Sequence, residues 1–170
     1  MKRIVFIVCL FTTIAWCQTT PVKKNTGEWD VLDRTFISVI EALTKANEAN
    51  FIALSAKQIE CTECAEAGTY TGAGYYVDPY DFYDGISKSF TKSAIFKALS
   101  ARGYGFSAVT LKGLKVPYLP AGTAKGLKVY DVWIDTYLPD EVSKGHPGTR
   151  HTFRFIKVGG KFVFFGLASI

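Results

Sequence analysis

The stretch that decides the fold is the C-terminal one, Arg150-His151-Thr152-Phe153-Arg154-Phe155-Ile156-Lys157-Val158-Gly159-Gly160-Lys161-Phe162-Val163-Phe164-Phe165-Gly166-Leu167-Ala168-Ser169-Ile170. Within it, two segments rich in Phe, Val and Ile lie on either side of the Gly-Gly pair. Apolar runs separated by two glycines are a strong signal for a β-hairpin. The density of aromatic residues predicts a sheet with one deeply buried face.

Two further strands are expected before this hairpin, because the apolar pattern there is typical of strands rather than helices. They cover residues 104–111 and 129–138. A segment rich in Gly and Pro, 112–128, separates the two strands, and residues 139–148 connect the second one to the hairpin. The C-terminal half therefore predicts about four antiparallel strands.

Helices are expected ahead of these strands. Apolar residues at helical spacing predict a long helix over 29–46 and a short one ending near Ser55, with one or two short strands between 57 and 77. Asp78-Pro79 is a helix start signal, with Asp as the N-cap and Pro at the first helical position. An apolar stripe then runs to Arg102 with a break expected near 87–89, and Gly103 supplies the stop.

Helices followed by a meander of strands are typical of the α+β class. We expect N-terminal helices packed on a curved, mainly antiparallel sheet, a cone or roll that ends in the C-terminal hairpin. Over residues 29–170 this order resembles the nuclear-transport-factor-2-like superfamily of cystatin-like α+β cones. The resemblance implies a pocket between the helices and the concave sheet, and homodimers through the sheet. Its members include isomerases, cyclases and binding-only domains, so it leaves the function open.

The first 17 residues are typical of a secretory signal peptide. Lys2-Arg3 is a basic start, and residues 4–14 are apolar but too short to span a membrane comfortably. Cleavage after Cys17 is expected, with cleavage after Ala15 as the alternative. Lipidation of Cys17 is less favoured, because the bulky Trp16 precedes it.

These features predict an exported protein, periplasmic or secreted. The expected organisation is a signal peptide over 1–17, a flexible linker over 18–28 and a single α+β domain over 29–170. No span of the membrane is expected after removal of the signal peptide.

The charge of the chain is mild and dispersed. The 20 basic and 15 acidic residues give a net charge of +5, and loss of Lys2 and Arg3 with the signal peptide lowers it to +3. Basic residues spaced singly are typical of a solvated surface, so we expect no nucleic-acid partner. The expected partner is a small ligand or another protein, and a homodimer is a further expectation from the resemblance.

Cys61 and Cys64 are the two cysteines that follow the signal peptide, in the pattern C-x-x-C. A local disulfide is the favoured interpretation for an exported chain. A redox-active pair is the second, although the pair does not open a helix after a strand as in thioredoxin-like proteins. A zinc site with His146 and His151 is the third, although the two pairs lie far apart in the sequence.

Other motifs of catalysis or cofactor binding are missing from the sequence. It contains no nucleophile elbow, phosphate loop, dinucleotide fingerprint or H-E-x-x-H. Asp78, Asp81 and Asp84 are not spaced as in an EF-hand loop, and Asp78 is better explained as a helix cap. We therefore expect no cofactor and no metal site, and no residue is assigned a catalytic role.

The candidate pocket residues are Asp131, Trp133, Asp135 and Tyr137, which alternate onto one face of the predicted strand 129–138. If the opposite face of this strand is the buried one, the two aspartates are expected to be solvated, which is the favoured interpretation. If instead their own face lines the cone, a carboxylate beside Trp133 is desolvated and suited to proton abstraction.

Three hypotheses about function follow. The first is an exported, non-enzymatic domain that binds a small ligand or a partner protein. The second is a small-molecule isomerase or cyclase with Asp131 or Asp135 as the base. The third is a thiol–disulfide protein that uses Cys61 and Cys64. The sequence favours the non-enzymatic hypothesis, because it carries no catalytic signature.

Overall fold

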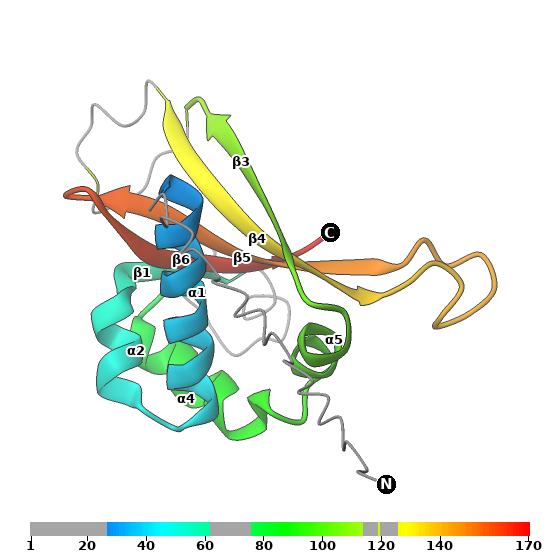
Figure 1. The fold of residues 1–170 in the computed structure, drawn as a ribbon. Helices are drawn as coiled ribbons and strands as arrows, with labels where there is room; N and C mark the ends of the chain where they lie inside the picture. The colour runs from blue at the N-terminus through cyan, green and yellow to red at the C-terminus, as the bar shows by residue number, and fades with distance from the viewer. Residues whose placement is uncertain (1–26, 62–75, 114–118, 120–125) are drawn as a thin grey trace, which may run out of the picture.

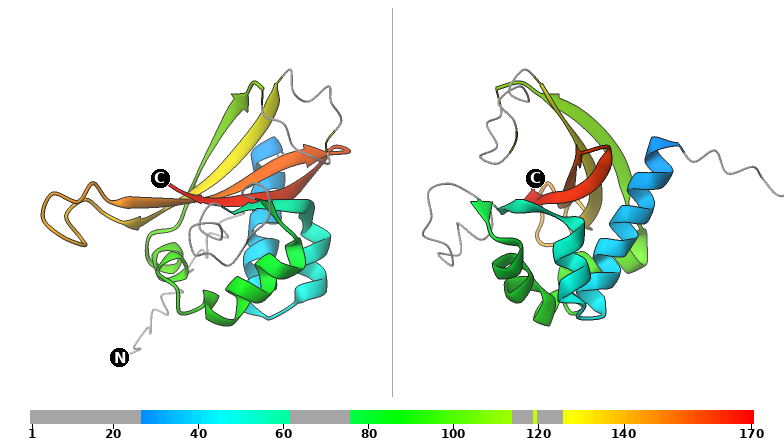
Figure 2. Two further views of the ribbon diagram at one scale, coloured as in Figure 1. Left: turned by 180° about the vertical axis from the view of Figure 1, so that it is seen from behind. Right: turned by 90° about the vertical axis from the view of Figure 1, so that its left-hand side faces the viewer.

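The computed structural model describes residues 27–61, 76–113, 119 and 126–170, and everything below concerns these residues. The chain belongs to the α+β class, with helices on one face of a strongly curved sheet (Figures 1 and 2). No helix in these ranges is long and apolar enough to cross a membrane.

The described helices follow the expected start and stop signals. They are α1 (Glu28–Thr44), α2 (Glu48–Leu54), α4 (Pro79–Phe90) and α5 (Ala94–Arg102). The Asp78 carboxylate accepts a hydrogen bond from the backbone N–H of Tyr80 at 2.8 Å, which caps α4. The Ser93 hydroxyl caps α5 in the same way, so the helix breaks after Phe90 and not at 87–89 as predicted.

The sheet has six strands in the order β2-β1-β6-β5-β4-β3. The strands are β1 (Ser55–Cys61), β2 (Tyr76–Val77), β3 (Gly105–Leu111), β4 (Leu127–Tyr137), β5 (Thr149–Val158) and β6 (Lys161–Ser169). The predicted hairpin is confirmed as β5 and β6, which pair antiparallel across Gly159-Gly160. The pairing of β1 with β6 is parallel, so the sheet is mixed.

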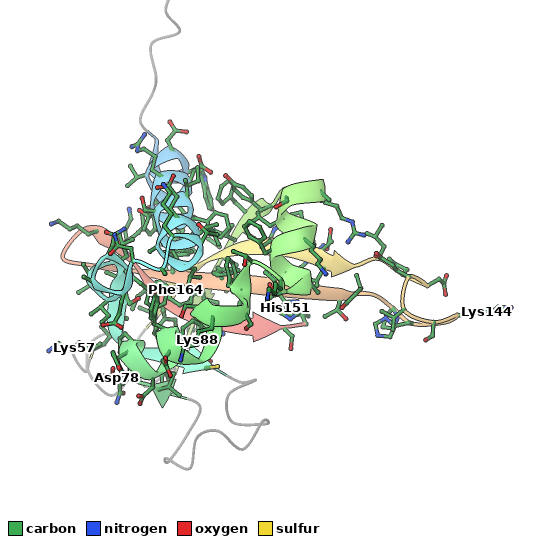
Figure 3. All side chains as sticks on the ribbon, turned by 90° about the horizontal axis from the view of Figure 1, so that it is seen from below. Lys57, Asp78, Lys88, Lys144, His151 and Phe164 are labelled. Carbon is green, nitrogen blue, oxygen red and sulfur yellow. The ribbon has the colours of Figure 1, made fainter. Side chains whose placement is uncertain are left out.

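The main core lies between the helices and the sheet and is built from aromatic side chains. Phe164 of β6 (Figure 3) is its centre and is fully buried. The centre of its ring lies 5.5–5.8 Å from the ring centres of Phe51, Phe82, Phe153 and Phe155. Side chains at alternate positions of a strand point to the same face, which explains why Tyr130, Val132 and Ile134 of β4 and Phe153 and Phe155 of β5 join this core.

The opposite face of the sheet is also partly buried, which differs from the expectation of a single buried face. It carries a second, smaller apolar cluster of residues from four strands: Ala56, Leu127, Val129, Ile156 and Phe165. Because both faces of β4 and β5 bear buried residues, a polar side chain placed beside this cluster is shielded from water too.

The N-terminal helix departs from the prediction in two details. Trp29 and Ile37, two of the apolar residues whose helical spacing predicts this helix, are 42% and 41% exposed instead of buried. The helix also begins at Glu28, one residue before the predicted start at residue 29, and Glu28 is bound to the sheet. Its carboxylate accepts hydrogen bonds from Lys128, Lys157 and the Tyr130 hydroxyl, which lower the pKa of Glu28 to about 2, Lys157 most.

Candidate binding site on the face opposite the helices

A polar strip runs along the face of β4 and β5 that points away from the helices. Three cross-strand pairs form it: Asp131 faces Arg154, Trp133 faces Thr152, and Asp135 faces Arg150. An acid–arginine pair therefore lies on each side of the tryptophan. Opposite charges directly across an antiparallel ladder stabilise the pairing of the two strands.

The first pair extends across the sheet to β1. The Nη1 atom of Arg154 donates to Oε2 of Glu60 at 2.7 Å, while its Nε lies 3.5 Å from Oδ1 of Asp131. Gly166 of β6 stands between Arg154 and Glu60, and a Cβ there would lie 2.9 Å from the Cβ of Glu60. The missing side chain thus leaves the space through which Arg154 reaches Glu60.

Asp131 is the most desolvated of the predicted site residues. Its side chain is 18% exposed, and its Oδ1 is buried without a hydrogen-bond partner in the described structure. Burial raises the pKa of Asp131 above its ordinary value, against the opposing charge of Arg154. Burial also raises the pKa of Tyr76, with the Glu60 carboxylate as a second cause.

The second pair holds an arginine on the tryptophan ring. The guanidinium of Arg150 lies 4.3 Å from the centre of the Trp133 ring, and its Nε donates to Oδ1 of Asp135 at 2.8 Å. On the β3 side, Trp133 covers Gly105, where a Cβ would lie 2.2 Å from the ring. Any larger residue at position 105 would displace the indole, so glycine fixes where the ring lies.

Two grooves open at this end of the strip. The larger, 420 Å³, is lined by Asp135, Arg150 and a largely apolar set of neighbours: Tyr137, Leu138, Pro139, Pro147, Gly148, Thr149 and Ile170. The smaller, 280 Å³, is lined by Arg102, Gly103, Tyr104, Trp133, Asp135 and Leu138. Asp135 and Leu138 line both grooves.

The walls of these grooves are braced by hydrogen bonds to the connection between β4 and β5. Arg102 of α5 donates to the carbonyl oxygens of Asp135 and Thr136 at 3.0 Å and pairs with Glu141 at 2.7 Å. Glu141 accepts from the backbone N–H of Leu138 at 2.6 Å. The α5 helix therefore holds the end of β4 in place, and with it one wall of each groove.

The four predicted pocket residues occupy two different environments. The predicted alternation is confirmed, because Tyr130, Val132 and Ile134 join the helix-side core. Trp133, Asp135 and Tyr137 line the grooves, whereas Asp131 lies further along the strip in the Glu60–Arg154 cluster. The expectation of solvated aspartates fits Asp135, which is 39% exposed, but is wrong for Asp131, which is 18% exposed and has a buried Oδ1.

The structure describes only some of the residues in the cysteine and histidine predictions. Cys61 is the buried last residue of β1, while Cys64 lies outside the described residues, so their disulfide stays a prediction. His151 is bound through Nδ1 to the Thr136 hydroxyl, and Nδ1 of His146 accepts from the backbone N–H of Gly148. No cluster of three metal-ligating side chains occurs in the described ranges.

Sequence reasoning missed the basic half of the strip and Glu60. The alternation of Arg150, Thr152 and Arg154 along β5 was a readable signal, because it complements the alternating acids of β4. Glu60 had no such signal, since it reaches the strip only through the parallel pairing of β1 with β6.

No protein-family model and no curated protein matches the sequence. A solved structure described as a calcium/calmodulin-dependent protein kinase type II association domain, from Thiobacillus denitrificans, is similar at a TM-score of 0.33 and 8% identity, over 81% of this chain and 91% of that chain. A second solved structure, a protein of unknown function with a cystatin-like fold from Nostoc punctiforme, is similar at a TM-score of 0.36 and 9% identity. The match covers 82% of this chain and 86% of that chain.

Membership of the nuclear-transport-factor-2-like superfamily stays a prediction. The α+β class rests on the helices and the mixed sheet themselves. The structure defines a curved α+β domain with a charged, tryptophan-centred strip on the face of the sheet away from its helices. Two grooves lie at one end of this strip, and the smaller one also borders the C-terminal end of α5.

Proposed function

We propose that this chain is an exported, non-enzymatic domain that binds a small organic ligand in the two grooves that share Asp135 and Leu138. The observation that carries the proposal is the position of Trp133. Its ring is backed by Gly105, covered by Arg150 and part of the wall of the smaller groove. An aromatic ring held in place beside apolar walls and a few polar groups is the usual composition of a ligand site.

The enzymatic alternative has one observation in its favour, the raised pKa of Asp131. Strongly perturbed carboxylates occur at active sites, but structural ion-pair networks perturb them as well. Neither described groove is lined by Asp131, which lies against Arg154 instead. A base must reach its substrate, so the grooves support binding better than proton abstraction.

The proposal predicts where small molecules bind. A panel of indole, benzyl alcohol, benzoate and benzamidine, titrated into the labelled protein, is expected to shift the NMR signals of the Trp133 indole and the Leu138 methyl groups saturably. The matched variants are Trp133→Leu and Trp29→Leu. The first is expected to abolish the saturable shifts, whereas the second, at an exposed tryptophan on α1, leaves them unchanged.

Shifts that centre on Trp29, or an absence of saturable shifts around Trp133 in the unsubstituted protein, would contradict the proposal. Because the mapping is made on the unsubstituted protein, it holds even if the Trp133 variant folds poorly.

A further inference from the structure

The strip contains one cation that is held in place and still has unused hydrogen-bond donors. Arg150 is fixed at two points, by Asp135 at its Nε and by the Trp133 ring beneath its plane. Its terminal nitrogens have no hydrogen-bond partner among the described residues, and its side chain is 45% exposed. Holding a guanidinium in one orientation reduces the entropy that a ligand must remove on binding.

The other two arginines near the strip are already engaged. Arg102 gives its terminal nitrogens to two backbone carbonyls and to Glu141. Arg154 lies between Glu60 and Asp131 with its side chain only 21% exposed. Of the three, Arg150 alone lines the larger groove, so an anionic group that enters this groove meets Arg150.

The charged residues around the larger groove limit how many negative charges the bound anion can carry. Asp135 balances Arg150, and Glu141 balances Arg102. A second negative charge on the ligand would therefore have no further cation of these pairs to bind, whereas one carboxylate matches the two-donor edge of a guanidinium. The remaining walls include Leu138, Pro139, Pro147 and Ile170, which suit an apolar body.

We propose that the ligand of this site is a small monocarboxylate with an apolar or aromatic body, anchored by the terminal nitrogens of Arg150 with its body along Leu138. The proposal rests on the proposed function, because it names the chemical class that the same grooves take.

The test compares benzoate with benzamide, which has nearly the same shape but no charge. Both are titrated into the protein near neutral pH while the Trp133 signal is followed. A hydrogen-bonded carboxylate on a charged donor is expected to bind about tenfold tighter than the neutral amide. Arg150→Gln is expected to remove this preference, whereas Lys144→Gln, at the tip of the β4–β5 connection (Figure 3), retains it.

Equal affinities for benzoate and benzamide at the groove would overturn the carboxylate assignment and leave the proposed binding function intact. A preference that survives in Arg150→Gln would overturn the role of Arg150. A failure of every compound of the panel to shift the Trp133 signal would overturn the binding function itself. The comparison in the unsubstituted protein does not depend on the folding of either variant.

Discussion

Replacing Phe164 by alanine is expected to lower the free energy of unfolding by about 3–5 kcal/mol, the range for a fully buried phenylalanine. Its ring touches four others from α2, α4 and β5, and it is completely inaccessible to water. The cavity left behind would be lined by aromatic rings of three elements that cannot collapse together. Urea denaturation followed by circular dichroism measures the loss.

The matched control for this prediction is Phe106→Ala on β3. Phe106 is 36% exposed and contacts Trp29 and Tyr104 at the margin of the sheet. Its removal is expected to cost well under half as much as that of Phe164. Similar losses for the two variants would show that the core is not centred on β6.

Replacing Arg154 by methionine is expected to lower the free energy of unfolding by about 2–4 kcal/mol near neutral pH. The substitution keeps the apolar length of the side chain but leaves Glu60 and Asp131 as two unpaired carboxylates, each only 18–19% exposed. Removing one partner of a buried ion pair costs more than the pair contributes, because the remaining charge stays desolvated.

The pH dependence of this loss has a definite sign. Arg154 opposes the burial that raises the pKa of Asp131, so its removal raises that pKa further. A folded-state pKa above the unfolded one means that the folded state prefers the protonated acid. The loss of stability in Arg154→Met is therefore expected to be largest near pH 7. It is expected to shrink as the pH falls toward the ordinary pKa of an aspartate.

The triple variant Arg154→Met, Glu60→Gln, Asp131→Asn supplies the control. With all three charges removed, it is expected to recover most of the lost stability at neutral pH. Denaturation curves at several pH values compare the variants. A loss that stays constant with pH, or a triple variant no more stable than the single one, would show that the cluster is not a buried charge network.

Much of the fold follows from local patterns in the sequence. The Gly-Gly pair between two Phe-rich runs was sufficient to predict β5 and β6, because a tight turn and strand-favouring residues act over short distances. The cap at Asp78 and the stop at Gly103 are local in the same sense. The position of β1 was less predictable, since it starts at Ser55 directly after α2 without turn residues between them.

The candidate site was only half predictable for a related reason. The period of two along β4 placed Asp131, Trp133 and Asp135 on one face, and the structure confirms this placement. How much of that face is exposed to solvent depends on contacts between residues far apart in the sequence. These are the second apolar cluster and the hydrogen bond from Arg154 across Gly166 to Glu60. Neither contact leaves a local pattern in the sequence, so the burial of Asp131 was missed.

The most direct test of the account is the set of nuclear Overhauser contacts made by the Trp133 indole protons. Trp133 lies on the face of the sheet away from the helices, against Gly105 and next to the guanidinium of Arg150. Strong contacts are therefore expected from the indole to the Hα protons of Gly105 and to the side chain of Arg150. Contacts from the indole to the rings of Phe153 or Phe164 would place it in the helix-side core and contradict the site.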